Sequence, residues 1–280
     1  MKVQVLGVGL LGPGLTDWAQ GAAALRQGWV TAPTVVPAPQ RLPATERRRA
    51  GTVVKASIVV ADQAVAAAGL QPALLPTVFT SSSGDPLNCH LLCEALAQAQ
   101  RLVSPTRFTN SVHNTAAGYW HIALQSRAPS TSLAAYDASF AAGLLEAGVQ
   151  CLAAQVPVLL VACDVPYPEP LHALRPLVDV FAVALVLGPA DGRHSDGRHT
   201  GGRHTGAAAV APLLELHSST EGLLGAATPC VDPTLEALRL GNPAARALPL
   251  LMSLAQAKPA RLVLQGAPGH ALAVDVLAAP

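Results

Sequence analysis

The chain has 280 residues, of which 51% are hydrophobic and 12% charged, and its formal net charge is +1. This composition is typical of a folded chain with a sizeable core, and it excludes an intrinsically disordered protein, which combines low hydrophobicity with high net charge. The near-zero charge argues against a nucleic-acid-binding protein, which needs a basic footprint. No run approaches the ~20 apolar residues that cross a bilayer, and the first residues lack the pattern of a signal peptide. Because the five cysteines are scattered, we expect free thiols, a reducing compartment and a cytoplasmic location.

Short apolar runs alternate with helical periodicities along the chain. The strands that we expect are Val3–Val8, Pro76–Ser83, Thr131–Ala135, Val156–Ala162, Val178–Leu187, Val210–His217, Arg261–Gln265 and Ala271–Val276. The helices that we expect begin at Thr16 or Asp17 and then cover Arg47–Ala68, Asp85–Arg101, Ser111–Leu124, Asp137–Ala153, Asp232–Leu240 and Ala244–Gln256, with a loop over Val103–Asn110. The alternation indicates an α/β fold with a largely parallel central sheet, and the last two strands suggest a hairpin.

A glycine motif follows the first strand. Gly7-Val8-Gly9-Leu10-Leu11-Gly12 has the spacing of a dinucleotide-binding loop. That chemistry also needs an acidic residue about 20 residues further on to hold the ribose. No acidic residue lies between Asp17 and Glu46, so we interpret the glycines as a turn.

Two clusters contain potential metal ligands. The tandem repeat of residues 192–206 spaces His194, His199 and His204 five residues apart, but it contains little that could pack. We expect a flexible loop, since a metal site needs ligands held in a fixed geometry. Cys89 and Cys93 share a predicted helix face without a second thiol pair, so no metal site and no cofactor are expected.

The most specific pattern lies between Asn110 and Asp164. Asn114-Thr115-Ala116-Ala117-Gly118 stands at a helix start, Ala128-Pro129-Ser130 precedes a short strand, and a buried strand ends in Ala162-Cys163-Asp164. In this order and spacing the sequence resembles the N-terminal half of the β-ketoacyl synthases of the thiolase superfamily. That family has an Asn-x-x-Ala-Gly helix start, a Gly-Pro-Ser turn, a Thr-Ala-Cys nucleophile and a strand ending in Ala-Gly-Gly. The resemblance covers about residues 1–187 and implies a thiolase-like α/β half-fold, with a mostly parallel mixed sheet and helices on both faces.

The position of the family's nucleophilic cysteine holds another residue. An alignment without gaps places Asp137 there, and a shift of one or two residues places Tyr136 or Ala135. The acyl-enzyme step needs a thiolate, which none of these supplies. The family's His-Gly-Thr-Gly-Thr and Asn-x-Phe-Gly-Phe-Gly-Gly segments have no counterpart after residue 187, since the nearest, Gly269-His270-Ala271, lacks the threonine. The resemblance therefore implies no catalytic residues and a role like that of a chain-length factor in type II polyketide or aryl polyene synthesis.

The resemblance also implies partners. A chain-length factor forms a heterodimer with a β-ketoacyl synthase, and edge strands of this superfamily pair antiparallel across the dimer axis. The edge strand implied here consists of Thr131, Ser132, Leu133, Ala134 and Ala135. The implied interface and acyl-tunnel residues are His113, Asn114, Gly118, Tyr119, Trp120, Tyr136, Asp137, Ser139 and Phe140. The aromatic members of this set are equally well explained as core or interface anchors, and the run Arg47-Arg48-Arg49 is either a contact for an acyl carrier protein or a solvated helix face.

We expect three parts in the chain: a ketosynthase-like domain over 1–188, a flexible loop over 189–206, and a truncated C-terminal segment over 207–280 that packs on the first domain. The expected function is that of a non-catalytic subunit that pairs with a β-ketoacyl carrier-protein synthase in fatty-acid or polyketide elongation and shapes its acyl tunnel. Two alternatives stay open. One is a weakly active acyltransferase or decarboxylase that uses Asp137 or Ser139. The other is a free-standing protein that binds acyl chains, or a metal on the histidine loop.

Overall fold

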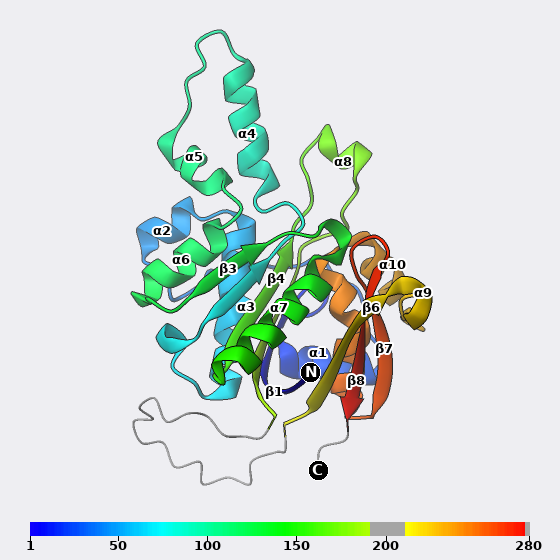
Figure 1. Ribbon diagram of the computed structural model, residues 1–280. Coiled ribbons are helices and arrows are strands. Elements are labelled where there is room, and N and C mark those ends of the chain that lie inside the picture. Colours follow the sequence, from blue (N-terminus) through cyan, green and yellow to red (C-terminus); the bar gives the residue numbers. More distant parts are fainter. Residues whose placement is uncertain (191–210, 278–280) are drawn as a thin grey trace.

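A computed structural model describes residues 1–190 and 211–277, which form one sheet with helices on both faces (Figure 1). The strand order is β3-β2-β4-β5-β1-β6-β8-β7. The strands are β1 (Lys2–Leu11), β2 (Thr77–Thr80), β3 (Ser130–Leu133), β4 (Val158–Asp164), β5 (Phe181–Pro189), β6 (Leu213–Thr220), β7 (Ala260–Gln265) and β8 (His270–Leu277). The helices are α1 (Trp18–Gln27), α2 (Ala44–Arg49), α3 (Thr52–Ala68), α4 (Pro86–Ala97), α5 (Pro105–Ser111), α6 (Thr115–Leu124), α7 (Ser139–Ala154), α8 (Leu171–Leu174), α9 (Glu221–Leu224), α10 (Pro233–Gly241) and α11 (Leu248–Gln256), with 3₁₀ turns η1 (Pro72–Leu74), η2 (Tyr136–Ala138) and η3 (Ala244–Ala247).

The expectation of a largely parallel sheet is wrong. β2 is parallel to β3 and β4, whereas the other neighbours in the described sheet, from β4–β5 through to β8–β7, are antiparallel. Strands that run parallel need a long crossover connection, and α7 supplies it between β3 and β4, which flank β2. Only the short α8 separates β4 from β5, so the chain returns antiparallel. The expected hairpin of β7 and β8 is confirmed.

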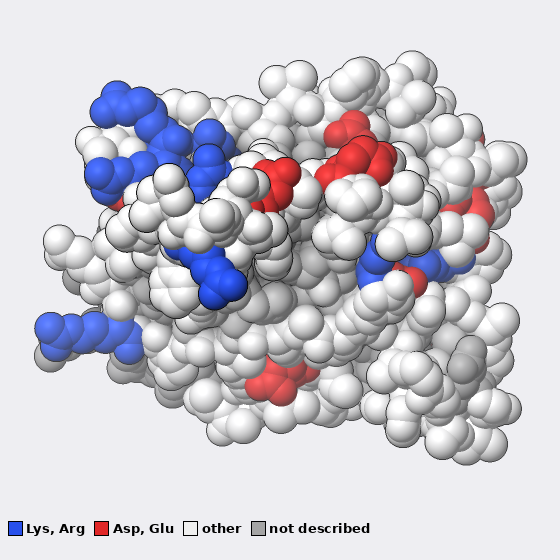
Figure 2. All heavy atoms as spheres, turned by 90° about the horizontal axis from the view of Figure 1, so that it is seen from above, with Lys and Arg blue, Asp and Glu red and all other residues white. Residues whose placement is uncertain are grey.

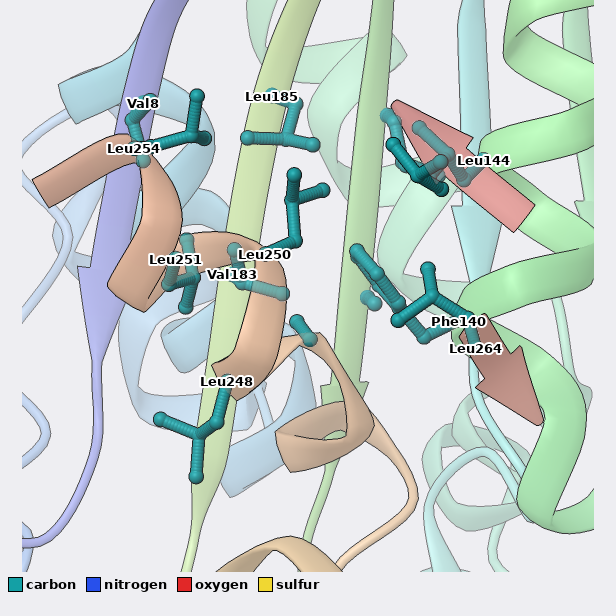
Figure 3. Close-up of a cluster of buried hydrophobic side chains, with 14 of the residues drawn as sticks. Val8, Phe140, Leu144, Val183, Leu185, Leu248, Leu250, Leu251, Leu254 and Leu264 are labelled. Carbon is teal, nitrogen blue, oxygen red and sulfur yellow. The ribbon is translucent and has the colours of Figure 1, made fainter. Parts of the chain in front are cut away.

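Two hydrophobic clusters lie on opposite faces of the sheet. One cluster contains α7, α11 and residues of α1, and its members include Phe140, Leu144, Val183 and Leu251 (Figure 3). The other contains α3 and α6. This two-sided burial explains why β4 and β5 are apolar along their whole length.

Gly7 and Gly9 of the glycine motif lie inside β1 and not in the turn that we expected, while Gly12 directly follows the strand. A Cβ on Gly7 would overlap the carbonyl oxygen of Ala64, and one on Gly9 would overlap that of Val60. Both carbonyls belong to α3. The glycines therefore let the α3 backbone approach the sheet closely.

Two helix expectations need correction. The expected helix Arg47–Ala68 is divided into α2 and α3, because the backbone is extended at Ala50 and Gly51. The Asp85 carboxylate packs where a Gly51 side chain would stand. The expected loop Val103–Asn110 contains α5, which Ser104 caps with its hydroxyl while a proline occupies the first helical position.

Residues 85–112 project from the body as an arm made of α4 and α5, which we call the α4–α5 arm (Figure 1). α4 buries only Pro86, and α5 buries only Asn110. Among the described helices, none is both long and apolar enough to cross a bilayer.

The described part of segment 207–280 joins the same sheet. β6 pairs with β1, and β8 and β7 continue the sheet beyond it. Most of the expected flexible loop 189–206, including its three histidines, lies outside the described residues.

Candidate functional site

The parallel strands β2, β3 and β4 have their carboxyl ends on the same side of the sheet, and polar residues follow each of them. Ser81, Ser82 and Ser83 follow β2, Tyr136 and Asp137 follow β3, and β4 ends with Asp164. The carboxyl edge of such strands is where α/β proteins place binding and catalytic groups. We therefore take this edge as the candidate site.

Tyr136 occupies a sharp turn between β3 and α7. Its φ is +53°, a left-handed value that few residues other than glycine adopt. Ser139 holds this turn, because its hydroxyl accepts the Ala135 N–H at 3.0 Å and donates to the Tyr136 carbonyl at 2.7 Å. Ser139 is 1% exposed. Its hydroxyl is thus committed to the turn and is a poor candidate for chemistry on a substrate.

The side chains of Tyr136 and Asp137 are held by arginines from distant parts of the chain. The Arg175 guanidinium lies 3.4 Å from the Tyr136 ring centroid and donates to Asp137 Oδ1 at 2.8 Å. Arg246, from η3, lies 3.8 Å from Asp137 Oδ2. The Asp137 carboxylate therefore lies between two arginines, of which Arg175 is hydrogen-bonded to it.

Asp164, at the end of β4, is buried at 1% exposure. Its Oδ1 accepts hydrogen bonds from Ser81 Oγ, the Ser82 N–H and Ser82 Oγ at 2.7–3.0 Å. Burial raises the pKa of Asp164 to about 6, although the serine hydrogen bonds and Arg175 oppose this rise. Asn242, which follows α10, donates to the Asp164 backbone carbonyl at 3.2 Å.

The edge strand expected at Thr131–Ala135 overlaps β3, which spans Ser130–Leu133 and is the outermost strand on its side of the sheet. The Thr77 N–H donates to the Pro129 carbonyl, and the Ser81 N–H donates to the Leu133 carbonyl. The backbone N–H and C=O groups of alternate residues in a strand point to opposite neighbours. Since the carbonyls of Pro129 and Leu133 point toward β2, those of Ser130 and Ser132 point away from it. They form the open side of the edge, while Ala134 and Ala135 follow the strand.

The structure does not bring the four aromatic candidates together. Trp120 and Phe140 are fully buried, but they belong to the clusters on opposite faces of the sheet. Tyr119 packs at the margin of the Trp120 cluster and donates to Asn110 Oδ1 at 3.2 Å. Tyr136 is 62% exposed. Only Tyr136 stands at the candidate site.

The remaining candidates lie at the start of α6. His113 Nε2 is 2.9 Å from the Ser81 carbonyl oxygen, which brings this residue to the site. Asn114 is exposed at the helix start, and Gly118 has open space where a Cβ would stand.

Several residues of the site were missed by sequence reasoning. Arg175 lies 38 residues from Asp137 in the sequence and belongs to no motif. Arg246 and Asn242 belong to no motif either. Asp164 offered one signal, since a carboxylate at the end of a fully apolar strand requires partners.

No cysteine occupies the turn after β3. Cys163 lies beneath the site on β4 and lines a cavity of about 20 Å³, room for about one water molecule, together with Ser57, Asp85 and His113. Burial raises the pKa of Cys163, so this thiol stays protonated. Cys89 and Cys93 lie on α4 in the arm.

Comparison with known proteins identifies the family. The sequence profile of the β-ketoacyl synthase N-terminal domain matches residues 17–218. The chain belongs to this family. No curated protein sequence matches the chain.

Solved structures agree on the fold over nearly the whole chain. The ketosynthase ApeO in complex with its chain length factor ApeC from Xenorhabdus doucetiae matches with a TM-score of 0.71 and 20% identity, covering 98% of this chain and 99% of that one. The ishigamide ketosynthase/chain length factor matches with a TM-score of 0.71 at 15% identity, covering 98% of both chains. The AntDE:AntF complex, a type II polyketide synthase acyl-carrier protein with its ketosynthase bound to the hexaketide, matches with a TM-score of 0.74 at 13% identity, covering 99% of both chains. At these identities the likeness establishes the thiolase-like fold, and it extends over the C-terminal segment as well.

Proposed function

We propose that this chain is a non-catalytic, chain-length-factor-like subunit that pairs with a β-ketoacyl synthase during fatty-acid or polyketide chain elongation. The observation that carries the proposal is the turn after β3. A ketosynthase presents a cysteine there, whereas this chain presents Tyr136 and Asp137. The Asp137 carboxylate is bound by Arg175 and faces Arg246, so it is a stabilised anion and a weak nucleophile.

The alternative of a weakly active acyltransferase gains no support from this geometry. Ser139 is buried and engaged on both sides of its hydroxyl. Among the described residues, no histidine forms a hydrogen bond or ion pair with the side chain of Asp137 or Ser139 through which it could act as a base. The acyl-chain-binding alternative gains no support from the cavity beside Cys163, which holds about one water.

The open edge of β3 supports the heterodimer. An uncovered strand edge presents unpaired N–H and C=O groups, which natural proteins cover. Its side chains carry no charge that would discourage pairing. An antiparallel partner strand from the ketosynthase would satisfy the outward groups of Ser130 and Ser132.

The charge distribution supports a contact with an acyl carrier protein as a second partner. α2 carries Arg47, Arg48 and Arg49, and Lys55 of α3 shares a shallow groove with the first two. Figure 2 shows Lys and Arg side chains gathered at the left, the side on which α2 lies in Figure 1. Such a patch attracts an acidic partner and weakens with salt.

The test of catalysis uses the isolated chain and an acyl-loaded carrier protein. Intact mass spectrometry should find no covalent acyl adduct on the chain, and release of CO₂ from a malonyl-loaded carrier protein should stay at the background rate. A ketosynthase encoded alongside this chain serves as the positive control. An adduct or decarboxylation that disappears in Asp137→Ala would overturn the non-catalytic role.

A further inference from the structure

The base of the α4–α5 arm converges on one buried carboxylate. Asp164 Oδ1 accepts three hydrogen bonds, two from Ser82 and one from Ser81. Asp164 Oδ2 is buried and has no hydrogen-bond partner among the described residues. All the polar contacts of this carboxylate are therefore directed at the segment that leads into the arm.

Ser81 links the two ends of the arm. Its Oγ accepts the N–H groups of Ser83 at 3.4 Å and Gly84 at 3.0 Å, just before α4 begins. Its carbonyl oxygen lies 2.9 Å from His113 Nε2, just after the arm ends. Gly84 itself has a left-handed φ of +68°, and a Cβ there would stand 3.4 Å from His113 Cα. The entry and the exit of the arm are thus tied to each other, and through Ser81 and Ser82 to Asp164.

The rest of the arm has few attachments to the body. Asn110 donates its amide to the Arg49 carbonyl at 2.9 Å. By contrast, Leu96, Leu102 and Phe108 are exposed along the arm. A segment with few buried contacts has a low free energy of local opening, so its base decides its orientation.

We infer that Asp164 is a positioning residue that latches the base of the α4–α5 arm to β4, so that the arm swings as a unit only when the bonds to Ser81 and Ser82 break. This inference concerns the motion of the arm and does not rest on the proposed function.

The ionisation of the latch gives the inference a distinctive consequence. In the closed arm, burial raises the pKa of Asp164 to about 6, whereas a hydrated aspartate titrates near its ordinary value of about 4. Arg175 is the cation that faces Asp164, the serines and Asn242 are neutral, and the adjoining Cys163 thiol stays protonated. Since the closed form binds the proton more tightly, acid favours closure and rising pH favours opening. Between pH 5 and pH 7.5 the opening equilibrium should rise about tenfold.

The experiment is hydrogen–deuterium exchange of the full chain at several pH values, corrected for the intrinsic chemical rate. We expect the amides of Ser82, Ser83 and Gly84, which are hydrogen-bonded at the base of the arm, to exchange about tenfold faster than the correction predicts at pH 7.5 relative to pH 5. Asp164→Asn keeps an acceptor at the Oδ1 position without the charge, so these amides should stay protected at every pH. Asp164→Ala removes the acceptor, so they should exchange fast at every pH.

Asp62→Asn is the matched control, because burial also raises the pKa of Asp62, and its partner is Arg41, remote from the arm. Its arm should exchange as in the unmodified chain. A flat pH profile in the unmodified chain, or the same profile in Asp164→Asn, would overturn the latch. Should Asp164→Ala fail to fold, the comparison of the unmodified chain with Asp164→Asn still decides.

Discussion

The guanidinium of Arg175 lies 3.4 Å from the centre of the Tyr136 ring, at the left-handed turn between β3 and α7. The same guanidinium donates to Asp137. One arginine from the segment between β4 and β5 thus holds two neighbouring residues of the turn after β3 in an ionic and stacked cluster.

This relationship predicts an energetic coupling between Arg175 and Tyr136. Because a cation over an exposed aromatic ring contributes about 0.5–1 kcal/mol, a double-mutant cycle of Arg175→Ala and Tyr136→Ala should give a coupling of about that size. Urea denaturation of the four proteins measures it. Fully additive effects would show that the stacked geometry does not persist in solution.

The glycines of β1 should tolerate no side chain where α3 crosses them. Gly9→Ala forces a Cβ into the Val60 carbonyl, so the free energy of unfolding should fall by about 1–3 kcal/mol or more. Gly118→Ala in α6 is the matched control, because nothing lies within 4 Å of its Cβ position. That variant should be neutral or more stable by up to about 1 kcal/mol, since alanine favours a helix. Equal effects of the two changes would refute the close packing of α3 on β1.

The stability of the chain should depend on the ionisation of Asp164. Its pKa in the folded state is raised to about 6, above the value of about 4 in an unfolded chain. The folded state therefore holds the proton more tightly, and stability from this group is gained as the pH falls from about 6 to about 4 and lost as the pH rises again. The difference in unfolding free energy between the unmodified chain and Asp164→Asn should change over that window by a few kcal/mol, as each pKa unit corresponds to about 1.4 kcal/mol. A constant difference from pH 4 to pH 8 would contradict this assignment.

Phe140 should behave as a core residue. It is fully buried between α7 and the sheet (Figure 3), so Phe140→Ala should cost about 3–5 kcal/mol of unfolding free energy. Phe140→Leu, which retains most of the volume, should leave the length of a partner ketosynthase's product unchanged. A shifted product length with unchanged stability would instead place Phe140 on an acyl tunnel.

The fold was predictable where local signals were strong. The apolar runs of β4 and β5, the Gly69 end of α3 and the β7–β8 hairpin all follow from the sequence. The direction of each strand was not predictable from the sequence, because side chains alternate with a period of two in both parallel and antiparallel strands. The direction depends on the connection between the strands. The helix α5 was missed because it has seven residues and too few turns for a periodicity.

The site was predictable only in part. The resemblance directed attention to Tyr136, Asp137 and the edge strand β3, which the structure places at one edge of the sheet. Arg175 and Arg246 could not be found, since isolated arginines carry no local pattern and meet Asp137 only through the fold.

The central claim is that this chain pairs through β3 with a catalytic ketosynthase. The direct measurement is the mass of the assembly formed with a ketosynthase encoded alongside it, by light scattering after size-exclusion chromatography over a dilution series, which gives both the stoichiometry and the binding constant. Ser132→Pro removes an outward N–H from the edge, and Ser132→Ala is the matched control that keeps it. We predict a one-to-one heterodimer with the unmodified chain and with Ser132→Ala, and a binding constant at least about tenfold weaker with Ser132→Pro, as loss of one or two interface hydrogen bonds implies. Separate elution of the two unmodified proteins, or a heterodimer that is indifferent to Ser132→Pro, would contradict the claim.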